Sequence, residues 1–284
     1  MSLTSRDLIP LSFDYDGYVR ENKIDILLGE ASTPADCSKK IIKSPTFSVD
    51  ISNNTPFPAE YDDLARLHYI VSQRKSLTVL EFGVGKSTLV IGDALLNNKR
   101  SNADYTSAAL RRKDAYQIHS VENHLNYMQI VDSQIPLILR EEGICNLHHS
   151  ELEVGTFLDK VCTYYSKIPN VCPDVIYLDG PDQFSPSGDV KGITTSHQDR
   201  MSMAADILLL EHFLQPSTLI IVDGRTANAR FLQCNLQRSW SHCYNEEWDQ
   251  HFFELQETPL GVYNKRMIDF CLGENFYNRI SSER

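Results

Sequence analysis

Leu77-Thr-Val-Leu-Glu-Phe-Gly-Val-Gly-Lys-Ser-Thr-Leu89 is the stretch that decides the fold of this chain. Its apolar, β-branched first half predicts a strand, with the acid Glu81 near the strand end. Gly83 and Gly85 follow one residue apart, and the next residues open a helical pattern. A strand, a glycine turn and a helix N-terminus present bare backbone N–H groups, and the glycines let a ligand approach the main chain. The stretch therefore indicates a site for a nucleotide-like ligand.

Apolar runs and amphipathic segments alternate along the rest of the chain, which is typical of a parallel sheet covered on both faces. The run at 174–178 is continuously apolar, as in a central parallel strand, and the polar segment 97–114 is expected to be an inserted loop. Apolar residues near 252–255, 262–263 and 268–271 predict two closing strands, expected to be antiparallel. We therefore predict an α/β fold with a doubly wound, mostly parallel seven-stranded sheet. The other expected strands are 78–82, 115–121, 144–148 and 218–222, and the expected helices are 60–75, 87–96, 124–142 with an interruption at Pro136, 156–167, 198–214 and 227–238.

The composition is that of an ordinary globular protein. Hydrophobic residues make up 42% of the 284 residues, which is ample material for a core. The net charge of −11 argues against a surface that follows a phosphate backbone, so nucleic acid is not an expected partner. The seven cysteines are scattered without a C-x-x-C pair, which signals neither a zinc site nor a disulfide framework. The sequence shows no signal-peptide pattern and no long apolar run, so we expect a cytoplasmic protein without a membrane partner.

Acidic residues end four of the predicted strands: Glu81, Glu122, Asp179 and Asp223. In an open α/β sheet, ligands bind outside the carboxyl ends of the strands, so these acids are expected at one binding edge. Helix capping or turn formation would explain each acid separately. An acid after the second strand suits the two hydroxyls of a ribose, which makes Glu122 the predicted ribose ligand. It lies 39 residues after the first glycine of the turn (122 − 83 = 39), and the inserted segment absorbs the excess over roughly 20 residues in the compact pattern.

Two nucleotide-binding motifs fit the glycine turn incompletely. A phosphate-binding loop, G-x-x-x-x-G-K-[ST], would share Gly85-Lys86-Ser87 but would need glycine where Leu80 stands. A dinucleotide motif, G-x-G-x-x-G, would need glycine or alanine where Thr88 stands. An NAD- or ATP-binding Rossmann-type enzyme therefore stays an alternative interpretation.

The segment from Glu81 to Ser87 resembles motif I of the class I S-adenosylmethionine-dependent methyltransferases, E/D-x-G-x-G-x-G/S. The resemblance runs from Tyr61 to Leu272 and includes the acids after the second and fourth strands. It implies the Rossmann-like methyltransferase fold for residues 60–284, preceded by an irregular N-terminal extension at 1–59, and S-adenosylmethionine as the cofactor. The cofactor-binding residues that it implies are Glu81 near the sulfonium or amino group, Gly83, Gly85 and Ser87 at the turn, Glu122 at the ribose, Ser150 and Glu151 at the adenine, and Asp179.

Methyl transfer from a sulfonium is an in-line displacement, so such an enzyme chiefly aligns the acceptor and excludes water. A general base helps when the acceptor is a hydroxyl or a protonated amine. Asp179, Asp182 and His197 follow the fourth strand and are the candidate catalytic residues. Small-molecule O-methyltransferases that resemble catechol methyltransferases hold a divalent ion with acids after the fourth and fifth strands. Asp179 and Asp223 are therefore candidate Mg²⁺ ligands, although Gly224 stands where an Asn is expected and Asp223 as a helix cap is the alternative.

The methyl acceptor is expected to be a small molecule. Asp179-Gly180-Pro181-Asp182 lacks the aromatic residue of the D-P-P-Y signature of enzymes that methylate base amines, and the acidic net charge agrees. Residues 1–59 are expected to form either a cap over the acceptor site or a strap or dimer contact, so a homo-oligomer stays open. A cofactor-binding module without turnover is a further alternative. The aromatic residues proposed for the cap are Phe13, Tyr15, Tyr18 and Phe57.

Overall fold

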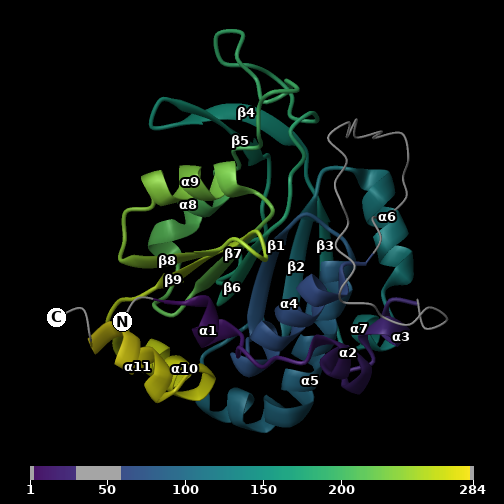
Figure 1. The fold of residues 1–284 in the computed structure, drawn as a ribbon, viewed down its shortest axis with the longest axis vertical. Coiled ribbons are helices and arrows are strands. Elements are labelled where there is room, and N and C mark those ends of the chain that lie inside the picture. Colours follow the sequence, from purple (N-terminus) through teal and green to yellow (C-terminus); the bar gives the residue numbers. More distant parts are fainter. Residues whose placement is uncertain (1–2, 30–58, 282–284) are drawn as a thin grey trace.

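The computed structural model describes residues 3–29 and 59–281, and a seven-stranded sheet forms its centre (Figure 1). The strands are β1 (Thr78–Phe82), β2 (Gln117–Glu122), β3 (Cys145–His149), β6 (Val175–Leu178), β7 (Leu219–Asp223), β8 (Trp240–Asn245) and β9 (Gln250–Leu255). They lie in the order β3-β2-β1-β6-β7-β9-β8, with parallel pairing from β3 to β7 and with β9 antiparallel to both of its neighbours. The predicted mostly parallel seven-stranded sheet is therefore confirmed.

Successive side chains of a strand point to opposite faces of the sheet, and each face has its own hydrophobic core. In β1, Val79 joins the core of one face and Leu80 the core of the other. The first core takes in residues of α4 (Tyr61–Gln73), α5 (Lys86–Ala109), α6 (Leu125–Gln134), α7 (Leu137–Glu141) and α10 (Gly261–Cys271). The second core takes in residues of α8 (Asp206–Leu210), α9 (Thr226–Asn235) and a hairpin of β4 (Leu152–Phe157) and β5 (Lys160–Tyr165). The last helix is α11 (Glu274–Ser281).

Asp174 fixes the amino end of β1. Its carboxylate accepts hydrogen bonds from the N–H groups of Leu77 (2.9 Å) and Thr78 (2.6 Å), and its own N–H donates to Thr78 O (2.9 Å). Nη2 of Arg112 lies 3.4 Å from the same carboxylate, and both side chains are buried. The buried carboxylate thus links the starts of β1 and β6 to the segment that precedes β2.

The polar segment 97–114 was expected to be a loop, but α5 continues through it to residue 109. The side chain of Asn98 donates to the carbonyl oxygens of Val71 (3.1 Å) and Ser76 (3.2 Å). A polar residue inside the helix is therefore satisfied by the neighbouring α4 and by the residues after it. Residues 97–109 are therefore helical despite a weak apolar pattern, because contacts with other parts of the fold stabilise the helix.

The helix expected at 156–167 is wrong, because these residues belong to the β4-β5 hairpin. The two-residue turn Leu158-Asp159 has φ values of 47° and 62°, and a type I′ turn requires positive φ at both positions. Asn-Gly or Asp-Gly is the usual sequence signal for such a turn. Neither residue here is glycine or asparagine, so the pattern gave no sign of a hairpin.

Two further expectations fail in the C-terminal third. The helix expected at 198–214 is reduced to α8 and a short 3₁₀ helix, η1 (Glu211–Phe213). The side-chain amide of Asn228 both accepts from and donates to the backbone of Ala204 (2.9 and 3.0 Å). Ala204, just before α8, also forms a β-bridge with Thr163 of β5. Of the expected closing strands, 252–255 lies in β9, but 262–271 forms α10, and β8 precedes β9 instead.

The described part of the N-terminal extension packs on three elements of the fold, with its first helix against β8, its second against α4 and its third against α5. It contains three short helices, α1 (Ser5–Leu8), α2 (Tyr15–Glu21) and α3 (Ile24–Leu27). Phe13 contacts the rings of Tyr15, Tyr18 and Tyr69 at centroid distances of 4.8–5.1 Å, and Tyr18 Oη lies 2.8 Å from Nδ1 of His68. Phe57 lies outside the described residues. The cap or dimer role of residues 1–59, and their separation from 60–284, stay predictions.

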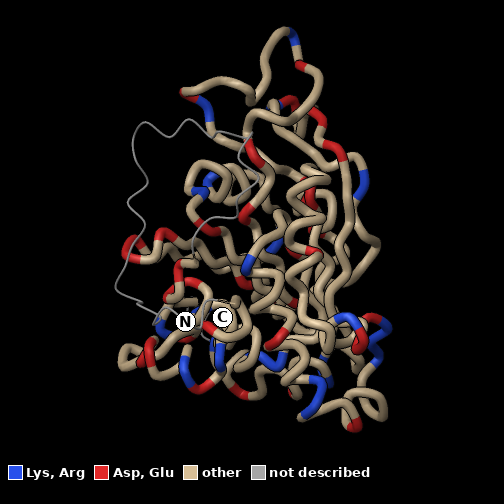
Figure 2. Tube along the Cα trace, turned by 90° about the vertical axis from the view of Figure 1, so that its right-hand side faces the viewer, with Lys and Arg blue, Asp and Glu red and all other residues tan. Residues whose placement is uncertain are grey.

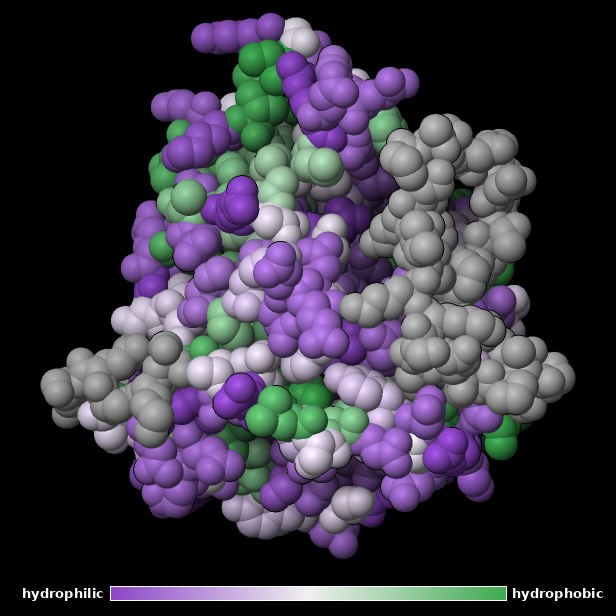
Figure 3. Space-filling view, viewed as in Figure 1, coloured by the Kyte–Doolittle hydropathy of each residue, from purple (hydrophilic) through white to green (hydrophobic). Residues whose placement is uncertain are grey.

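Charged residues of both signs are interspersed along the tube in Figure 2. Apolar side chains are exposed on the upper part of the face in Figure 3, over the β4-β5 hairpin and the loop beside it, where Leu158, Ile193 and Met201 are exposed. None of the helices within 3–29 and 59–281 combines the length and the apolar composition that crossing a bilayer would need.

Candidate functional site

The carboxyl ends of β1, β2 and β6 meet at one edge of the sheet, where the glycine turn lies. Gly83 has a φ of +98°, a conformation that favours glycine, and its N–H donates to Val121 O (2.9 Å). Beyond β6, the N–H groups of Asp179 and Gly180 both donate to Phe82 O (3.1 and 2.6 Å). The ends of three strands are thus held together around the turn, as the strand-end acids predicted.

Glu81 lies wholly buried beneath the turn. Its carboxylate accepts hydrogen bonds from the hydroxyls of Ser87 (2.5 Å), Thr88 (2.6 Å) and Ser120 (2.5 Å), and Thr88 Oγ1 in turn accepts from Gly85 N–H (3.1 Å). Burial raises the pKa of Glu81 to about 7, although the three hydroxyls act in the opposite direction. Glu81 and Ser87 therefore position the turn from inside, and their contact with the cofactor stays a prediction.

Glu122 lies at the mouth of the turn. Its Oε1 accepts from the N–H groups of Asn123 and His124 (both 2.8 Å), and its Oε2 accepts from Val84 N–H (3.3 Å). Burial raises the pKa of this carboxyl, while the hydrogen bonds from the backbone and the nearby His124 lower it. The predicted ribose acid is thus oriented by three N–H groups and lies against the glycine turn. An ionised carboxylate has about four acceptor positions, so Oε2 retains acceptor capacity.

The residues predicted at the adenine lie just beyond β3. The N–H of Ser150 donates to Glu122 O (2.9 Å), which places this segment beside the ribose acid. The Ser150 hydroxyl accepts from Lys167 N–H (2.9 Å) and lies 3.2 Å from Ser166 Oγ, so it stabilises the junction with the hairpin. Glu151 is exposed.

His124 and Asp182 form a polar pair across the edge of the sheet. Nε2 of His124 lies 2.9 Å from Oδ2 of Asp182 and 3.0 Å from the Ser185 hydroxyl. Oδ1 of Asp182 accepts from the N–H groups of Phe184 (2.7 Å) and Ser185 (2.9 Å). Burial would raise the pKa of Asp182, but these hydrogen bonds outweigh it and lower the pKa below its ordinary value. The half-buried carboxylate thus orients an imidazole that is 36% exposed.

Sequence reasoning missed His124 and two other residues at this edge. Tyr127 of α6 places its hydroxyl above the turn, since a Cβ on Gly85 would lie 3.7 Å from it. Burial, together with the charges of Glu122, Asp179 and Glu81, raises the pKa of Tyr127 to about 12. Arg225, after β7, donates to the backbone oxygens of Asp179 (2.5 Å) and Pro181 (2.7 Å) and braces that loop. The only sequence signal for His124, Tyr127 and Arg225 was that they follow the strand-end acids Glu122 and Asp223 within a few residues.

The predicted base His197 lies in the loop that follows Asp182. Its side chain is 54% exposed, and its Nδ1 lies 4.0 Å from Oδ2 of Asp199. The backbone oxygen of His197 accepts from the side chain of Gln183 (3.0 Å). His197 therefore contacts neighbouring residues of its own loop, and its catalytic role stays a prediction.

The predicted Mg²⁺ ligands do not fit a metal site. The carboxylate of Asp223 accepts from the Tyr177 hydroxyl (2.6 Å) and the Gln250 amide (3.1 Å). The carboxylate of Asp179 lies 3.9 Å from Nε of Arg225. The side-chain amide of Asn228, one helical turn beyond Asp223, forms hydrogen bonds with the backbone of Ala204, just before α8. Within the described ranges, no group of three or more His, Cys, Asp or Glu side chains is arranged to hold a metal ion.

A cavity of about 520 Å³ lies beside the start of α5. It is lined by Lys86 and Leu89 of α5, by Gln134 of α6 and by residues 26–29 of the N-terminal extension. The extension therefore contributes one wall to a space next to the glycine turn.

The glycine turn and the buried carboxylate of Glu122 thus lie together at the carboxyl edge of a doubly wound sheet, where open α/β sheets bind their ligands. The sheet is mostly parallel, with β9 antiparallel to both of its neighbours near one edge. No protein-family model matches the chain, and no curated protein matches it either.

Solved structures of methyltransferases are similar to this chain. The S-adenosylhomocysteine-bound methyltransferase PaMTH1 of Podospora anserina has a TM-score of 0.41 and 12% identity, over 74% of this chain and 83% of its own. An O-methyltransferase of Bacillus cereus has a TM-score of 0.39 and 13% identity, over 88% and 94%. The O-methyltransferase TomG of Streptomyces achromogenes has a TM-score of 0.38 and 13% identity, over 88% and 93%.

Proposed function

We propose that this chain is an S-adenosylmethionine-dependent methyltransferase that acts on a small-molecule acceptor. One observation carries the proposal: the Glu122 carboxylate is fixed by three N–H groups, including that of Val84 in the glycine turn. This arrangement holds an acceptor for a ribose hydroxyl next to bare backbone, as a nucleoside ligand requires.

Each group at the edge has a role in the proposal. Gly83 and Gly85 line the cofactor, Glu122 accepts a ribose hydroxyl, and Glu81 keeps the turn in place from below. Asp179 and Glu151 lie on the exposed side of the edge, where they are the remaining candidates for polar contacts with the cofactor. When bound, the cofactor supplies an electrophilic methyl group on its sulfonium.

His124 and Asp182 are the residues that we propose remove the proton from the acceptor. His124 Nε2 is oriented by Asp182 Oδ2 at 2.9 Å, so the imidazole is the proposed base and the carboxylate its positioning group. We prefer His124 to the predicted base His197, because His124 is oriented by a half-buried carboxylate whereas the His197 side chain is 54% exposed. A hydroxyl or a protonated amine on the acceptor would need such a base.

Methyl transfer itself is tested by incubating the full chain with radiolabelled S-adenosylmethionine and a broad set of small hydroxyl- and amine-bearing compounds. We expect label in at least one compound, and we expect His124→Gln to reduce the labelling at least about tenfold while S-adenosylhomocysteine still binds. Tight cofactor binding with no labelled compound would favour the alternative of a binding module without turnover.

The NAD- or ATP-binding alternative is separated by calorimetry. Leu80 and Thr88 occupy positions at which the phosphate-loop and dinucleotide motifs need glycine or alanine, and Thr88 is engaged by Glu81. We therefore expect heat of binding with S-adenosylhomocysteine and none with NAD or ATP. Saturable binding of NAD or ATP, with no response to S-adenosylhomocysteine, would overturn the proposal.

A further inference from the structure

The hydroxyl of Tyr165, at the end of β5, is buried without a hydrogen-bond partner. The residue is 5% exposed, and its Oη makes no hydrogen bond within the described part of the chain. Buried polar atoms in folded proteins are nearly always hydrogen-bonded, because an unpaired one has lost its contacts with water. An unpaired hydroxyl beside a proposed binding site therefore points to a partner that a ligand supplies.

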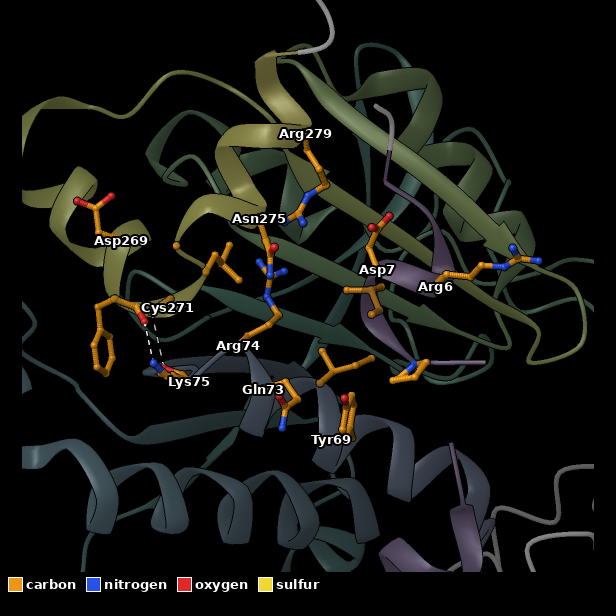
Figure 4. Close-up of a pocket in the computed structure, with 16 residues that line it drawn as sticks. Arg6, Asp7, Tyr69, Gln73, Arg74, Lys75, Asp269, Cys271, Asn275 and Arg279 are labelled. Carbon is orange, nitrogen blue, oxygen red and sulfur yellow. Dashed lines mark hydrogen bonds between the residues drawn. The ribbon is translucent and has the colours of Figure 1, made fainter. Parts of the chain in front are cut away.

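A second cavity of the molecule shows the ordinary arrangement, in which buried polar groups are paired. It has a volume of about 440 Å³ and lies between α1, the end of α4, the end of α10 and α11, near the amino ends of the parallel strands (Figure 4). Nη1 of Arg74 and Nε of Arg279 both donate to the fully buried carboxylate of Glu254 (2.9 and 2.7 Å). None of the described side chains that line this cavity has a buried polar atom without a partner. The second cavity therefore gives no sign of a polar ligand, in contrast to the surroundings of Tyr165.

Contacts of the end of β5 place Tyr165 beside the proposed ribose acid. Its ring stacks on that of Phe82, the last residue of β1, with the ring centroids 5.8 Å apart. The hydroxyl of the next residue, Ser166, lies 3.2 Å from that of Ser150. The N–H of Ser150 in turn donates to the backbone oxygen of Glu122 (2.9 Å). The end of β5 therefore lies against the carboxyl ends of β1 and β2.

Charged groups of the binding edge act on the Tyr165 hydroxyl. Burial and then the charge of Glu122 raise its pKa well above the ordinary value of a tyrosine. Asp206 and Asp182 act in the same direction, and Arg225 acts in the opposite one. The hydroxyl therefore keeps its proton, so it is a hydrogen-bond donor near a carboxylate that, when ionised, only accepts.

The nearby acids bind other groups. Oδ1 of Asp206 accepts from the backbone N–H of Tyr165 (3.0 Å), and Oδ2 of Asp182 lies 2.9 Å from Nε2 of His124. Glu122 keeps an acceptor position on Oε2, yet it makes no hydrogen bond with the Tyr165 hydroxyl. A hydroxyl group between Tyr165 and Glu122 would pair with both, because a hydroxyl donates one hydrogen bond and accepts others. Ribose, the group expected at Glu122, has two such hydroxyls.

We propose that Tyr165 is a second ribose-binding residue, whose hydroxyl donates a hydrogen bond to the same ribose hydroxyl that donates to Glu122. This role rests on the proposed function, because it takes S-adenosylmethionine as the ligand. The Tyr165 hydroxyl is closed off from solvent, so the ribose displaces the side chains that cover it as it binds. A nucleoside without the bridging hydroxyl leaves both Tyr165 and Glu122 unpaired, so the site discriminates against it.

The first test is a calorimetric titration of Tyr165→Phe with S-adenosylhomocysteine, together with urea unfolding of the variant alone. We expect binding about tenfold weaker than in wild type, with an equal or higher urea midpoint, because the substitution removes an unpaired buried hydroxyl. Tyr164→Phe is the matched control, since it removes the hydroxyl of the neighbouring residue, which donates to Thr156 O (3.2 Å). The control should change the binding less than about twofold. Wild-type affinity in Tyr165→Phe, or a lower urea midpoint, would overturn the proposal.

The 2′-deoxy and 3′-deoxy analogues of S-adenosylhomocysteine locate the bridging hydroxyl. We expect one analogue to bind wild type at least about tenfold more weakly than S-adenosylhomocysteine, and Tyr165→Phe to weaken the binding of that analogue less than about twofold further. A full tenfold effect of Tyr165→Phe on both analogues would show that its partner is not a ribose hydroxyl and would contradict the proposal. If wild type does not bind S-adenosylhomocysteine, the proposed function fails together with this role. If wild type binds it and the two tyrosine variants behave alike, only the role of Tyr165 fails.

Discussion

Gly180 lies directly against Gly83, so that the loop after β6 and the turn after β1 touch through bare backbone. A Cβ on Gly180 would lie 2.7 Å from both the Cα and the N of Gly83. A Cβ on Gly83 would lie 3.0 Å from Gly180 N, and the φ of +98° at Gly83 already disfavours a side chain. Two glycines that are far apart in the sequence therefore define one backbone contact at the proposed cofactor site.

Substitutions of Gly180 and Gly85 distinguish a glycine needed for packing from one proposed to face the ligand. Gly180→Ala should destabilise the fold by about 1–3 kcal/mol, because neither backbone can move away freely. At Gly85 a Cβ would meet only ordinary contacts, at 3.7 Å from Tyr127 Oη and 3.8 Å from Ser87 Oγ, and φ is extended. Gly85→Ala should therefore change stability by less than about 0.5 kcal/mol, measured by urea unfolding, yet weaken S-adenosylhomocysteine binding about tenfold or more. Normal binding by Gly85→Ala would show that the ligand does not approach the turn.

Replacing Glu122 tests the ribose contact. Glu122→Ala should weaken the binding of S-adenosylhomocysteine by about 1–3 kcal/mol, because a charge-assisted hydrogen bond to the sugar is lost. Glu153→Ala is the matched control, since it removes an exposed carboxylate from β4 that has no proposed contact with the cofactor. The dissociation constants come from calorimetry. An unchanged value for Glu122→Ala would move the ribose site elsewhere.

The buried carboxyl of Glu81 should give the fold a characteristic pH dependence. Its pKa is raised from 4.5 to about 7, so between these values the folded chain binds more protons than the unfolded chain. Stability from this group is therefore greatest below pH 4.5 and is lost as the pH rises through 7, by up to about 3 kcal/mol. Glu81→Gln should flatten the free energy of unfolding between pH 5 and 8, measured by urea titration at each pH. A slope that is the same in wild type and variant would contradict this account.

Asp174 should be a large contributor to stability at the amino end of β1. Asp174→Ala would leave the N–H groups of Leu77 and Thr78 without their acceptor and Arg112 without its buried partner. We expect a loss of about 3–5 kcal/mol in urea unfolding. Asp174→Asn keeps one acceptor oxygen and should lose less. If both variants were as stable as wild type, the buried carboxylate would have no part in holding β1.

The sequence pattern predicted the elements that carry the site better than the elements that surround it. β6 and β7 were found because buried parallel strands are continuous apolar runs, and β1 and β2 were found from shorter apolar stretches that end in acids. The hairpin at Leu158-Asp159 was missed because its turn uses no glycine. The helical part of 97–114 was missed because its polar residues are satisfied by tertiary contacts.

The directions of the side chains at the site could not be predicted from the sequence. The pattern placed Glu81 and Glu122 at successive strand ends, but only the fold shows that Glu81 points into hydroxyls below the turn while Glu122 lies at its mouth. The pairing of His124 with Asp182 could not be predicted from sequence, because the two residues are 58 positions apart.

A crystal structure of the full chain with S-adenosylhomocysteine tests the central claim most directly. The account predicts a ribose hydroxyl within about 2.7–3.2 Å of the Glu122 carboxylate and the methionine part along Gly83 and Gly85. A nucleoside bound at another edge of the sheet, or a ribose that makes no contact with Glu122, would contradict it.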